Sequence, residues 1–258
     1  MSYNLRYDNP EDGENRWDLR KDRVVNLIRF HDTDFVGTQE GLLHQLRHID
    51  EQAPELDWIG VGRDDGVEEG EFSAIFFNRN RYELVAESDS TIWLSETPGR
   101  PSKSWDADLP RILTFGQFRQ LSTGKTFYVF NTHFDHIGVE ARQQSARLIV
   151  ETIREISGDL PVVVTGDFNV TPDSDPYQVM TGSRSPLQDA YNSSVLPHVG
   201  PEFTFSGFYL SDDPSERRID YIFTNDAIEV SKHAILPYYR NGRYPSDHLP
   251  VLAEILLR

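Results

Sequence analysis

Two polar residues with catalytic potential, Asp167 and Asn169, follow a short run of β-branched residues at positions 162–165. The run is too short for a helix, so it predicts a buried central strand that ends at Gly166. In an α/β protein the carboxyl ends of such strands form the floor of a binding crevice. We therefore expect Asp167 and Asn169 to project into a crevice and Phe168 to point back into the core. A turn that only closes the strand is the alternative for this tetrapeptide taken alone.

Polar side chains also stand at the ends of two other predicted strands. His133, Asp135 and His136 follow a strand predicted to end near position 131, and this combination suggests a metal or a phosphate site. For His136 we favour a structural role in the loop. Glu40 follows an apolar stretch and precedes a helix predicted to start near Leu42. Taken alone, Glu40 is better explained as a first-turn carboxylate that the helix dipole stabilises.

A third set of candidates lies toward the end of the sequence. Asp220 belongs to an alternating stretch that begins at Arg218 and predicts a strand, and Asp247 and His248 precede a last apolar stretch. Taken alone, Arg218 would form a strand-end ion pair and Asp247 would cap a loop. Their occurrence together with the other strand-end residues argues for one shared site instead.

The composition excludes several kinds of site and partner. The chain of 258 residues has 42 acidic and 25 basic side chains and a net charge of -17, and such a surface repels polyanions such as duplex DNA. The absence of cysteine excludes disulfides and thiolate ligands, so a metal must be held by oxygen or imidazole. No apolar run reaches membrane-spanning length, and the first residues do not resemble a signal peptide. We expect a soluble, cytoplasmic protein, although the first strand begins so early that a removed leader stays an open alternative.

The elements that must position the candidate residues are mainly strands, with a few covering helices. No repeat and no linker-like change in composition divides the chain, so we predict one domain over residues 1–258. The helices are spaced so as to cover outer faces, which favours two mixed sheets packed face to face between helices. The predicted strands lie at 3–7, 35–37, 72–77, 81–86, 111–121, 126–131, 161–165, 218–223 and, as an edge or closing strand, 251–257; the predicted helices lie at 17–30, from 42, at 139–156 and from 171.

Six short motifs occur in order over the whole chain: Tyr3-Asn4, Gln39-Glu40, Asn131-Thr132-His133, Gly166-Asp167-Phe168-Asn169, Arg218-Ile219-Asp220-Tyr221 and Ser246-Asp247-His248. Each motif is weak alone, but together, at compatible spacing, the six resemble those of the endonuclease/exonuclease/phosphatase superfamily. The resemblance implies the four-layer α/β sandwich of DNase I-like proteins, a divalent cation, usually Mg²⁺ or Mn²⁺, and hydrolysis of a phosphoester. The residues at 4–8, with Trp105-Asp106 and Arg111, resemble a bacterial branch of the superfamily.

The resemblance implies a metal side of the site. Glu40 matches the metal-binding glutamate of the superfamily, Asn4 is expected beside it, and Asp247 is expected as the second carboxylate on this side. Mg²⁺ prefers hard oxygen ligands and keeps most of its waters, so one or two carboxylates are enough to hold it. The ion would neutralise a phosphate oxygen and stabilise the leaving oxygen.

The remaining motifs are implied to act on the water and the phosphate. Asp167 matches the candidate base that orients and deprotonates the attacking water, and Asn169 would position water or phosphate. His248 would donate to a non-bridging phosphate oxygen, with Asp220 as the partner that fixes its tautomer and raises its pKa. His133 fits a second donor to the phosphate.

Three further residues are candidates for substrate contacts. Arg6 stands where many nuclease members carry an acidic metal ligand, and it would either contact the substrate phosphate or pair with Asp8 or another carboxylate. Trp105 lies in a loop with proline and glycine, where it forms either a lid over the core or a wall of the cleft. Trp105 or the segment at 203–205 would stack on the substrate, and Arg111 completes the set.

Three functions are compatible with the sequence. We predict a divalent-metal-dependent phosphoester hydrolase that acts on a small or modest-sized substrate such as a phosphorylated sugar, inositol, nucleotide or lipid head group. An endonuclease or exonuclease of the same superfamily is the alternative. Duplex nucleic acid is disfavoured because basic residues are scattered, and their densest group, at 16–23, is predicted to be a solvated helix face. A non-catalytic binding module is the third possibility, and the complete set of candidate catalytic residues argues against it. We infer no obligate partner.

Overall fold

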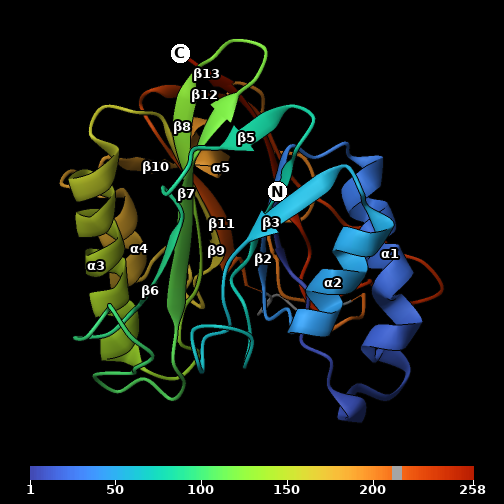
Figure 1. The fold of residues 1–258 in the computed structure, drawn as a ribbon. Helices are drawn as coiled ribbons and strands as arrows, with labels where there is room; N and C mark the ends of the chain where they lie inside the picture. Colours follow the sequence, from blue (N-terminus) through green and yellow to red (C-terminus); the bar gives the residue numbers. More distant parts are fainter. Residues whose placement is uncertain (211–216) are drawn as a thin grey trace.

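Two β-sheets pack face to face between two layers of helices in the computed structural model, which describes residues 1–210 and 217–258 (Figure 1). Figure 1 shows α3 (Val139–Ser157) and α4 (Asp175–Thr181) on one side, and α1 (Trp17–Phe30) and α2 (Leu43–Gln52) on the other. A short helix, α5 (Ala190–Ser193), and a 3-10 helix, η1 (Pro10–Asn15), complete the helices of the described ranges. This arrangement confirms the predicted four-layer sandwich.

The first sheet has the order β12-β13-β1-β2-β4-β3 within the described ranges. Only β1 and β2 in this order are parallel, so the sheet is mixed as predicted. β13, predicted as an edge or closing strand, instead lies between β12 and β1, because β12, which was not predicted, pairs with its other side. The strands are β1 (Ser2–Asn4), β2 (Phe35–Gln39), β3 (Leu56–Ile59), β4 (Ile75–Asn78), β12 (Ile228–Ile235) and β13 (Val251–Leu257).

The second sheet has the order β10-β11-β9-β8-β7-β5, with β6 also paired to β7. β9 is the predicted central strand, and it is buried along its whole length between parallel β8 and antiparallel β11. Phe168, directly after β9, is buried against the rings of Phe134 and Tyr221, which confirms that it points into the core. The strands are β5 (Tyr82–Leu84), β6 (Ser90–Trp93), β7 (Ile112–Gln120), β8 (Thr126–His133), β9 (Val162–Asp167), β10 (Leu187–Asp189) and β11 (Asp220–Asn225).

The side chain of Asn131 in β8 joins the two sheets. Its Nδ2 atom donates to the carbonyl oxygens of Thr38 and Ala74 at 2.8 and 2.9 Å, on the side of the first sheet. Its Oδ1 atom accepts from Nε2 of Gln39 at 2.7 Å and from Oγ1 of Thr165 at 2.9 Å. Every donor and acceptor position of this buried amide is therefore used, which fixes the two sheets against each other beneath the strand ends.

The strand ends of both sheets meet at one edge of the sandwich. Parallel β1 and β2 end there, as do parallel β8 and β9. Because β11 is antiparallel to β9 and β13 is antiparallel to β1, the beginnings of these two strands lie at the same edge. The residues at or next to these strand ends are Asn4, Glu40, His133, Asp167, Asp220 and His248.

Helix α1 spans the predicted residues, but one member of its basic group, Arg20, does not lie on the solvated face that the sequence predicts. Arg20 is only 3 % exposed, because its guanidinium donates to backbone carbonyl oxygens from three different segments. The carbonyl of Pro245 lies 225 positions away in the sequence and that of Leu5 lies in a separate segment before the helix, so no pattern within α1 marks Arg20 as buried. Within the described ranges, no helix is long and apolar enough to cross a membrane.

Candidate active site

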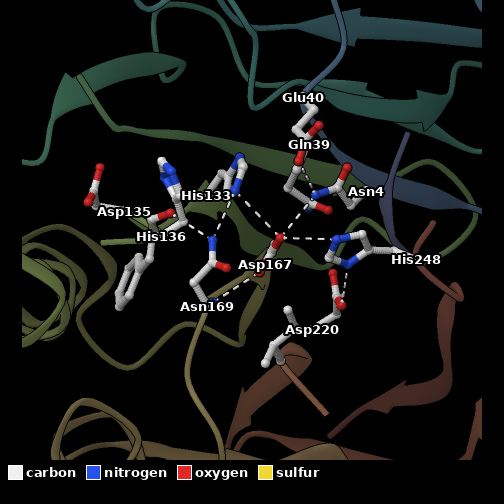
Figure 2. A network of polar contacts seen from close by, with 12 residues as sticks. Asn4, Gln39, Glu40, His133, Asp135, His136, Asp167, Asn169, Asp220 and His248 are labelled. Carbon is white, nitrogen blue, oxygen red and sulfur yellow. Dashed lines mark hydrogen bonds and ion pairs between the residues drawn. The ribbon is translucent and has the colours of Figure 1, made fainter. Parts of the chain in front are cut away.

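Asp167, the last residue of β9, is the point on which the polar side chains of the site converge (Figure 2). Its Oδ2 atom accepts a hydrogen bond from Nδ2 of Asn4 at 2.9 Å and lies 3.5 Å from Nε2 of His133 and 3.8 Å from Nε2 of His248. Its Oδ1 atom accepts from the backbone N–H of Asn169 at 3.0 Å. Burial raises the pKa of Asp167 to about 7, and a neighbouring carboxylate adds to this effect. A carboxylate with this pKa can accept a proton near neutral pH.

His248 is held by a carboxylate on the side away from Asp167. Its Nδ1 atom lies 2.8 Å from Oδ2 of Asp220, and both side chains are buried. Burial by itself lowers the pKa of His248, but Asp220 and then Asp167 outweigh burial and keep this pKa well above the usual value for histidine. Because Nδ1–H donates to Asp220, the Nε2–H of the imidazolium faces the site, where it can donate to an anion.

His133 lies on the opposite side of Asp167. Its Nε2 atom is 3.2 Å from Nδ2 of Asn169, and that amide nitrogen also donates to the carbonyl oxygen of the residue after His133 at 3.0 Å. In this arrangement Nε2 accepts a hydrogen bond, and the proton of the ring is on Nδ1, which faces Oε2 of Glu71 at 3.8 Å. Burial and two nearby arginines keep the pKa of His133 well below its usual value, so the ring is neutral. The predicted donation from His133 to a phosphate therefore requires Asn169 to release Nε2 and the ring proton to move from Nδ1 to Nε2.

The predicted metal side lies next to Asp167. Glu40 has a left-handed backbone with φ of 62°, and its carboxylate accepts from Nδ2 of Asn4 at 2.9 Å and from the backbone N–H of Tyr7 at 3.1 Å. Burial raises the pKa of Asp247, and the charge of Glu40 adds to this effect although His248 opposes it. The structure thus places several carboxylates close together. Their negative charges repel one another unless a cation is bound between them.

The donor atoms of this group fit a hard divalent cation. One carboxylate oxygen each of Glu40 and Asp167 and one ring nitrogen of His248 lie within 4.8 Å of one another. Protonated His248 is a poor ligand, whereas carboxylate oxygens suit Mg²⁺ and Mn²⁺. Asn4 turns its Nδ2 atom toward both carboxylates, so ligation through its oxygen needs the amide to rotate. The residues present therefore fit a cation held by carboxylates on the Glu40 side of Asp167.

A cleft of about 850 Å³ opens over these groups, and Arg6 lines it. The Nε and Nη2 atoms of Arg6 donate to the carboxylate of Asp12 at 3.0 and 2.9 Å. Nε also lies 3.8 Å from Oδ2 of Asp247. From the sequence, Arg6 was expected either to contact the substrate phosphate or to form a structural ion pair. The structure shows an ion pair with Asp12, and Arg6 also lines the cleft.

Arg111 also lines the cleft, next to His136. Its Nη2 atom lies 3.2 Å from Nδ1 of His136, and its Nε atom lies 3.5 Å from Oδ2 of Asp135. Nε and Nη1 are buried and make no hydrogen bond to any residue of the described ranges. Asp135 instead accepts backbone N–H groups, such as that of Gly138 at 2.7 Å, so it supports the loop. Arg111 is thus placed to meet an anion in the cleft, and His136, expected in a structural role, is exposed at its wall.

Trp105 was expected at the cleft, but it is not among the described residues that line the cleft. The next residue, Asp106, accepts the backbone N–H groups of Glu140 and Ala141 at 3.2 and 2.7 Å, which holds this loop at the start of α3. Among the described lining residues, Tyr7 and Phe205 carry a phenol or phenyl ring, and Phe205 belongs to the predicted stacking segment at 203–205. Its side chain is 42 % exposed, and its ring centroid lies 5.1 Å from that of His248.

Glu71 and its partner Arg63 are charged residues of the site that were not predicted from the sequence. Glu71 lines the cleft, and both of its carboxylate oxygens accept from Arg63, at 2.7 and 3.1 Å. Burial raises the pKa of Glu71, and the charge of Glu40 adds to this effect. Both residues lie in a charged stretch at 63–71 without strand or helix periodicity. The only available sign was the place of Glu71 directly before the apolar run at 72–77.

Two comparisons relate the sequence to known proteins. The model of the Endonuclease/Exonuclease/phosphatase family matches residues 1–248. The uncharacterized protein L388 of Acanthamoeba polyphaga mimivirus is 26% identical over 250 residues, which cover 92% of this chain and 91% of the viral protein. The exoribonuclease subunit Ccr4 of Coccidioides immitis is 22% identical over 94% of this chain but only 43% of its own length. The chain therefore spans less than half of that larger relative.

Solved structures agree with this assignment. An endonuclease/exonuclease/phosphatase from Bacteroides vulgatus superposes with a TM-score of 0.94 at 42% identity, over 100% of this chain and 97% of its own. A mannosyl-6-phosphatase of Bacteroides thetaiotaomicron VPI-5482 superposes with a TM-score of 0.92 at 38% identity, over 99% of this chain and 98% of its own. The human Nocturnin catalytic domain superposes with a TM-score of 0.76 at 20% identity, over 99% of this chain and 91% of its own, so it shares the fold. This chain belongs to the Endonuclease/Exonuclease/phosphatase family and is a phosphoesterase with a DNase I-like fold.

Proposed function

We propose that this protein is a divalent-metal-dependent phosphoesterase that hydrolyses small phosphorylated molecules, with phosphorylated sugars as the first candidates. The observation that carries the proposal is the convergence of a histidine donor and a carboxylate-lined metal side on Asp167, at the base of a cleft of about 850 Å³. A cleft of this size is typical of sites for small ligands. The 38% identity to a mannosyl-6-phosphatase along nearly the whole chain supports a phosphorylated sugar as substrate.

Glu40 is the first candidate ligand for the cation, with Asp247 and Asn4 beside it. Oxygen ligands of this kind favour Mg²⁺ or Mn²⁺ over softer metals. When bound, the ion would neutralise phosphate oxygens and stabilise the leaving oxygen.

The protein residues would then position water and receive its proton. Asp167 accepts the proton of the attacking water on Oδ2, while the backbone N–H of Asn169 holds Oδ1. His248 donates its Nε2–H to a non-bridging phosphate oxygen as negative charge builds there, and Asp220 keeps the ring oriented and protonated. His133 stays neutral beside Asn169, where both can position the water or the phosphate.

The charges of the cleft favour a compact substrate over a nucleic acid. Its described lining carries four carboxylates, those of Glu40, Glu71, Asp167 and Asp247, against three arginines. A polyanion gains affinity where lysine or arginine neutralises successive phosphates, and the net charge of -17 opposes this over the surface as a whole. One phosphate at the metal avoids this repulsion.

A substrate screen with the purified protein and added Mg²⁺ or Mn²⁺ tests the proposal. The panel contains hexose 6-phosphates, inositol phosphates, nucleoside monophosphates, a phosphodiester, and single-stranded and duplex oligonucleotides. We expect at least one small phosphoester to be hydrolysed with a higher kcat/KM than every oligonucleotide, and Asp167→Asn protein to be inactive in parallel. Cleavage of oligonucleotides with every small phosphoester inert would favour the nuclease alternative.

A further inference from the structure

We propose that a second groove, on the far side of the 5–6 segment from the catalytic cleft, binds a multiply charged phosphate or sulfate anion. The groove has a volume of about 430 Å³ and lies between η1, α1 and the loop at 240–244, which is drawn in red beside α1 in Figure 1. Four arginines line it, Arg20, Arg23, Arg240 and Arg243, and no described residue lines both this groove and the catalytic cleft.

The turn at 240–243 places two of these arginines side by side. Its central residues, Asn241 and Gly242, have φ of 54° and 82°, as the tight turn of a two-residue hairpin requires. Arg240 and Arg243 exchange both backbone hydrogen bonds, at 3.1 and 3.2 Å, so they are directly opposite each other. Side chains of such a pair leave the ribbon on the same face.

Helix α1 contributes the other two arginines. Arg20 and Arg23 are three positions apart, so they lie on the same face of the helix. The Nη2 atom of Arg23 donates to the carbonyl oxygen of Arg243 at 2.8 Å, which joins the helix to the turn across 220 positions of sequence. The Nε atom of Arg23 is buried and makes no hydrogen bond to any residue of the described ranges.

The groove has an excess of positive charge that its own residues do not neutralise. Among the described residues that line it, Glu14 is the one carboxylate, and it pairs with Arg243. Arg20 donates to backbone carbonyl oxygens, which carry no full charge. Burial lowers the pKa of Arg23, and Arg240 and Arg243 lower it further. Like charges held this close repel one another, so an anion with two or more charges would stabilise the groove, and guanidinium groups bind phosphate and sulfate oxygens in pairs.

Anion binding to this groove is separable from catalysis. Without a cation the four carboxylates of the catalytic cleft offset its three arginines, so the described lining of that cleft has no excess of positive charge. The arginine groove needs no metal. The proposal therefore predicts anion binding to metal-free protein, independent of whether the proposed phosphoesterase activity is found.

Isothermal titration calorimetry of metal-free protein, at constant ionic strength adjusted with NaCl, tests the inference. One arm uses inorganic pyrophosphate and the other a heparin tetrasaccharide, so that the two possible sources of the anion, phosphate and sulfate ester, are distinguished. We expect one site, and we expect the double variant Arg240→Gln/Arg243→Gln to weaken the dissociation constant by about tenfold or more for the preferred anion. Arg240→Gln alone, an exposed position, should weaken it in the same direction.

The matched control is Arg147→Gln/Arg154→Gln, which removes two charges from the exposed side of α3 and should leave the dissociation constant within about twofold. Equal weakening by both double variants would show a general charge effect and overturn the site. Absence of any binding to wild-type protein would overturn it as well. Thermal melting and phosphoesterase turnover of each variant check that the fold is retained.

Discussion

The buried guanidinium of Arg20 donates a hydrogen bond of 3.2 Å to the carbonyl oxygen of Pro245, two positions before Asp247. It also donates to the carbonyl oxygens of Leu5 at 2.5 Å and Arg6 at 2.7 Å, directly after β1. One side chain of α1 thus connects the two segments that carry the metal-side residues at opposite ends of the chain. Its charge orients backbone groups near the active site without itself lining the catalytic cleft.

We expect Arg20→Met to lower the free energy of unfolding by roughly 3 kcal/mol or more, because buried carbonyl oxygens lose a charged donor. Urea denaturation of metal-free protein measures this change. Lys21→Met is the control on the next residue. Lys21 pairs with Asp18 at 2.8 Å on the helix surface, and its loss should change stability by less than about 1 kcal/mol. Equal stability of both variants would contradict the role of Arg20.

Asp167→Asn should lower kcat by roughly three or more powers of ten, because the amide cannot accept the proton of the attacking water. The amide can still accept the N–H of Asn169, so the fold should be retained. Steady-state kinetics on the best small phosphoester measures the loss. Turnover near that of the wild type would show that another group is the base.

Stability against pH gives a second measurement on the same variant. The folded protein raises the pKa of Asp167 to about 7, from about 3.9 in an unfolded chain. The folded state therefore binds this proton more tightly, and the stability that protonated Asp167 provides is lost as the pH rises from about 4 through about 7. In metal-free protein, Asp167→Asn should melt at a higher temperature than wild type at pH 8 and at the same temperature at pH 4.

Asp220→Asn should move the alkaline limb of the kcat profile to lower pH. Asp220 is the largest of the influences that raise the pKa of His248 against burial, so the variant loses the protonated ring earlier as the pH rises. Measurement of kcat from about pH 5 to about pH 10 gives the shift of the alkaline limb. His248→Ala should be the more severe variant, because it removes the donor as well as its charge. An unshifted profile in Asp220→Asn would contradict the assigned partnership.

Activity should vanish in EDTA and return with Mg²⁺ or Mn²⁺, because the proposed ligands of the cation are the carboxylate oxygens on the Glu40 side of Asp167. Glu40→Gln should raise the Mg²⁺ concentration needed for half-maximal activity, and excess Mg²⁺ should restore part of kcat. The hydrogen bonds that Glu40 accepts from Asn4 and Tyr7 include one that a glutamine oxygen can still accept. Full turnover after dialysis against chelator would exclude the metal.

Local patterns were sufficient to predict the elements that carry the site. The β-branched run before Asp167 predicted β9, and the spacing of apolar residues at 17–30 predicted α1. Phe168 points into the core, as its place directly after a strand indicates. The resemblance of the strand-end motifs to a known superfamily added the identification of this arrangement with the four-layer sandwich of DNase I-like proteins.

Features that depend on distant parts of the chain were not predicted. Arg20 has the local pattern of a surface residue, and its burial depends on carbonyl oxygens up to 225 positions away. β13 is an interior strand because β12 pairs with it, a choice that an apolar run cannot reveal. Trp105 is not among the described lining residues of the cleft, since Asp106 next to it holds this loop at the start of α3, whereas Phe205 does line the cleft.

Phe205→Ala should raise KM for a small phosphoester by about tenfold while changing kcat less. The ring of Phe205 is exposed in the cleft and lies next to His248, so the part of the substrate beyond the phosphate meets it once the phosphate is bound. An aromatic face contributes about 1 kcal/mol or more to binding an apolar or sugar surface, which corresponds to the expected change in KM. Trp105→Ala is the matched control, since it removes a larger ring outside the cleft and should leave KM unchanged. If Trp105→Ala raised KM and Phe205→Ala did not, the substrate would have to lie against the loop at 104–109 rather than over His248.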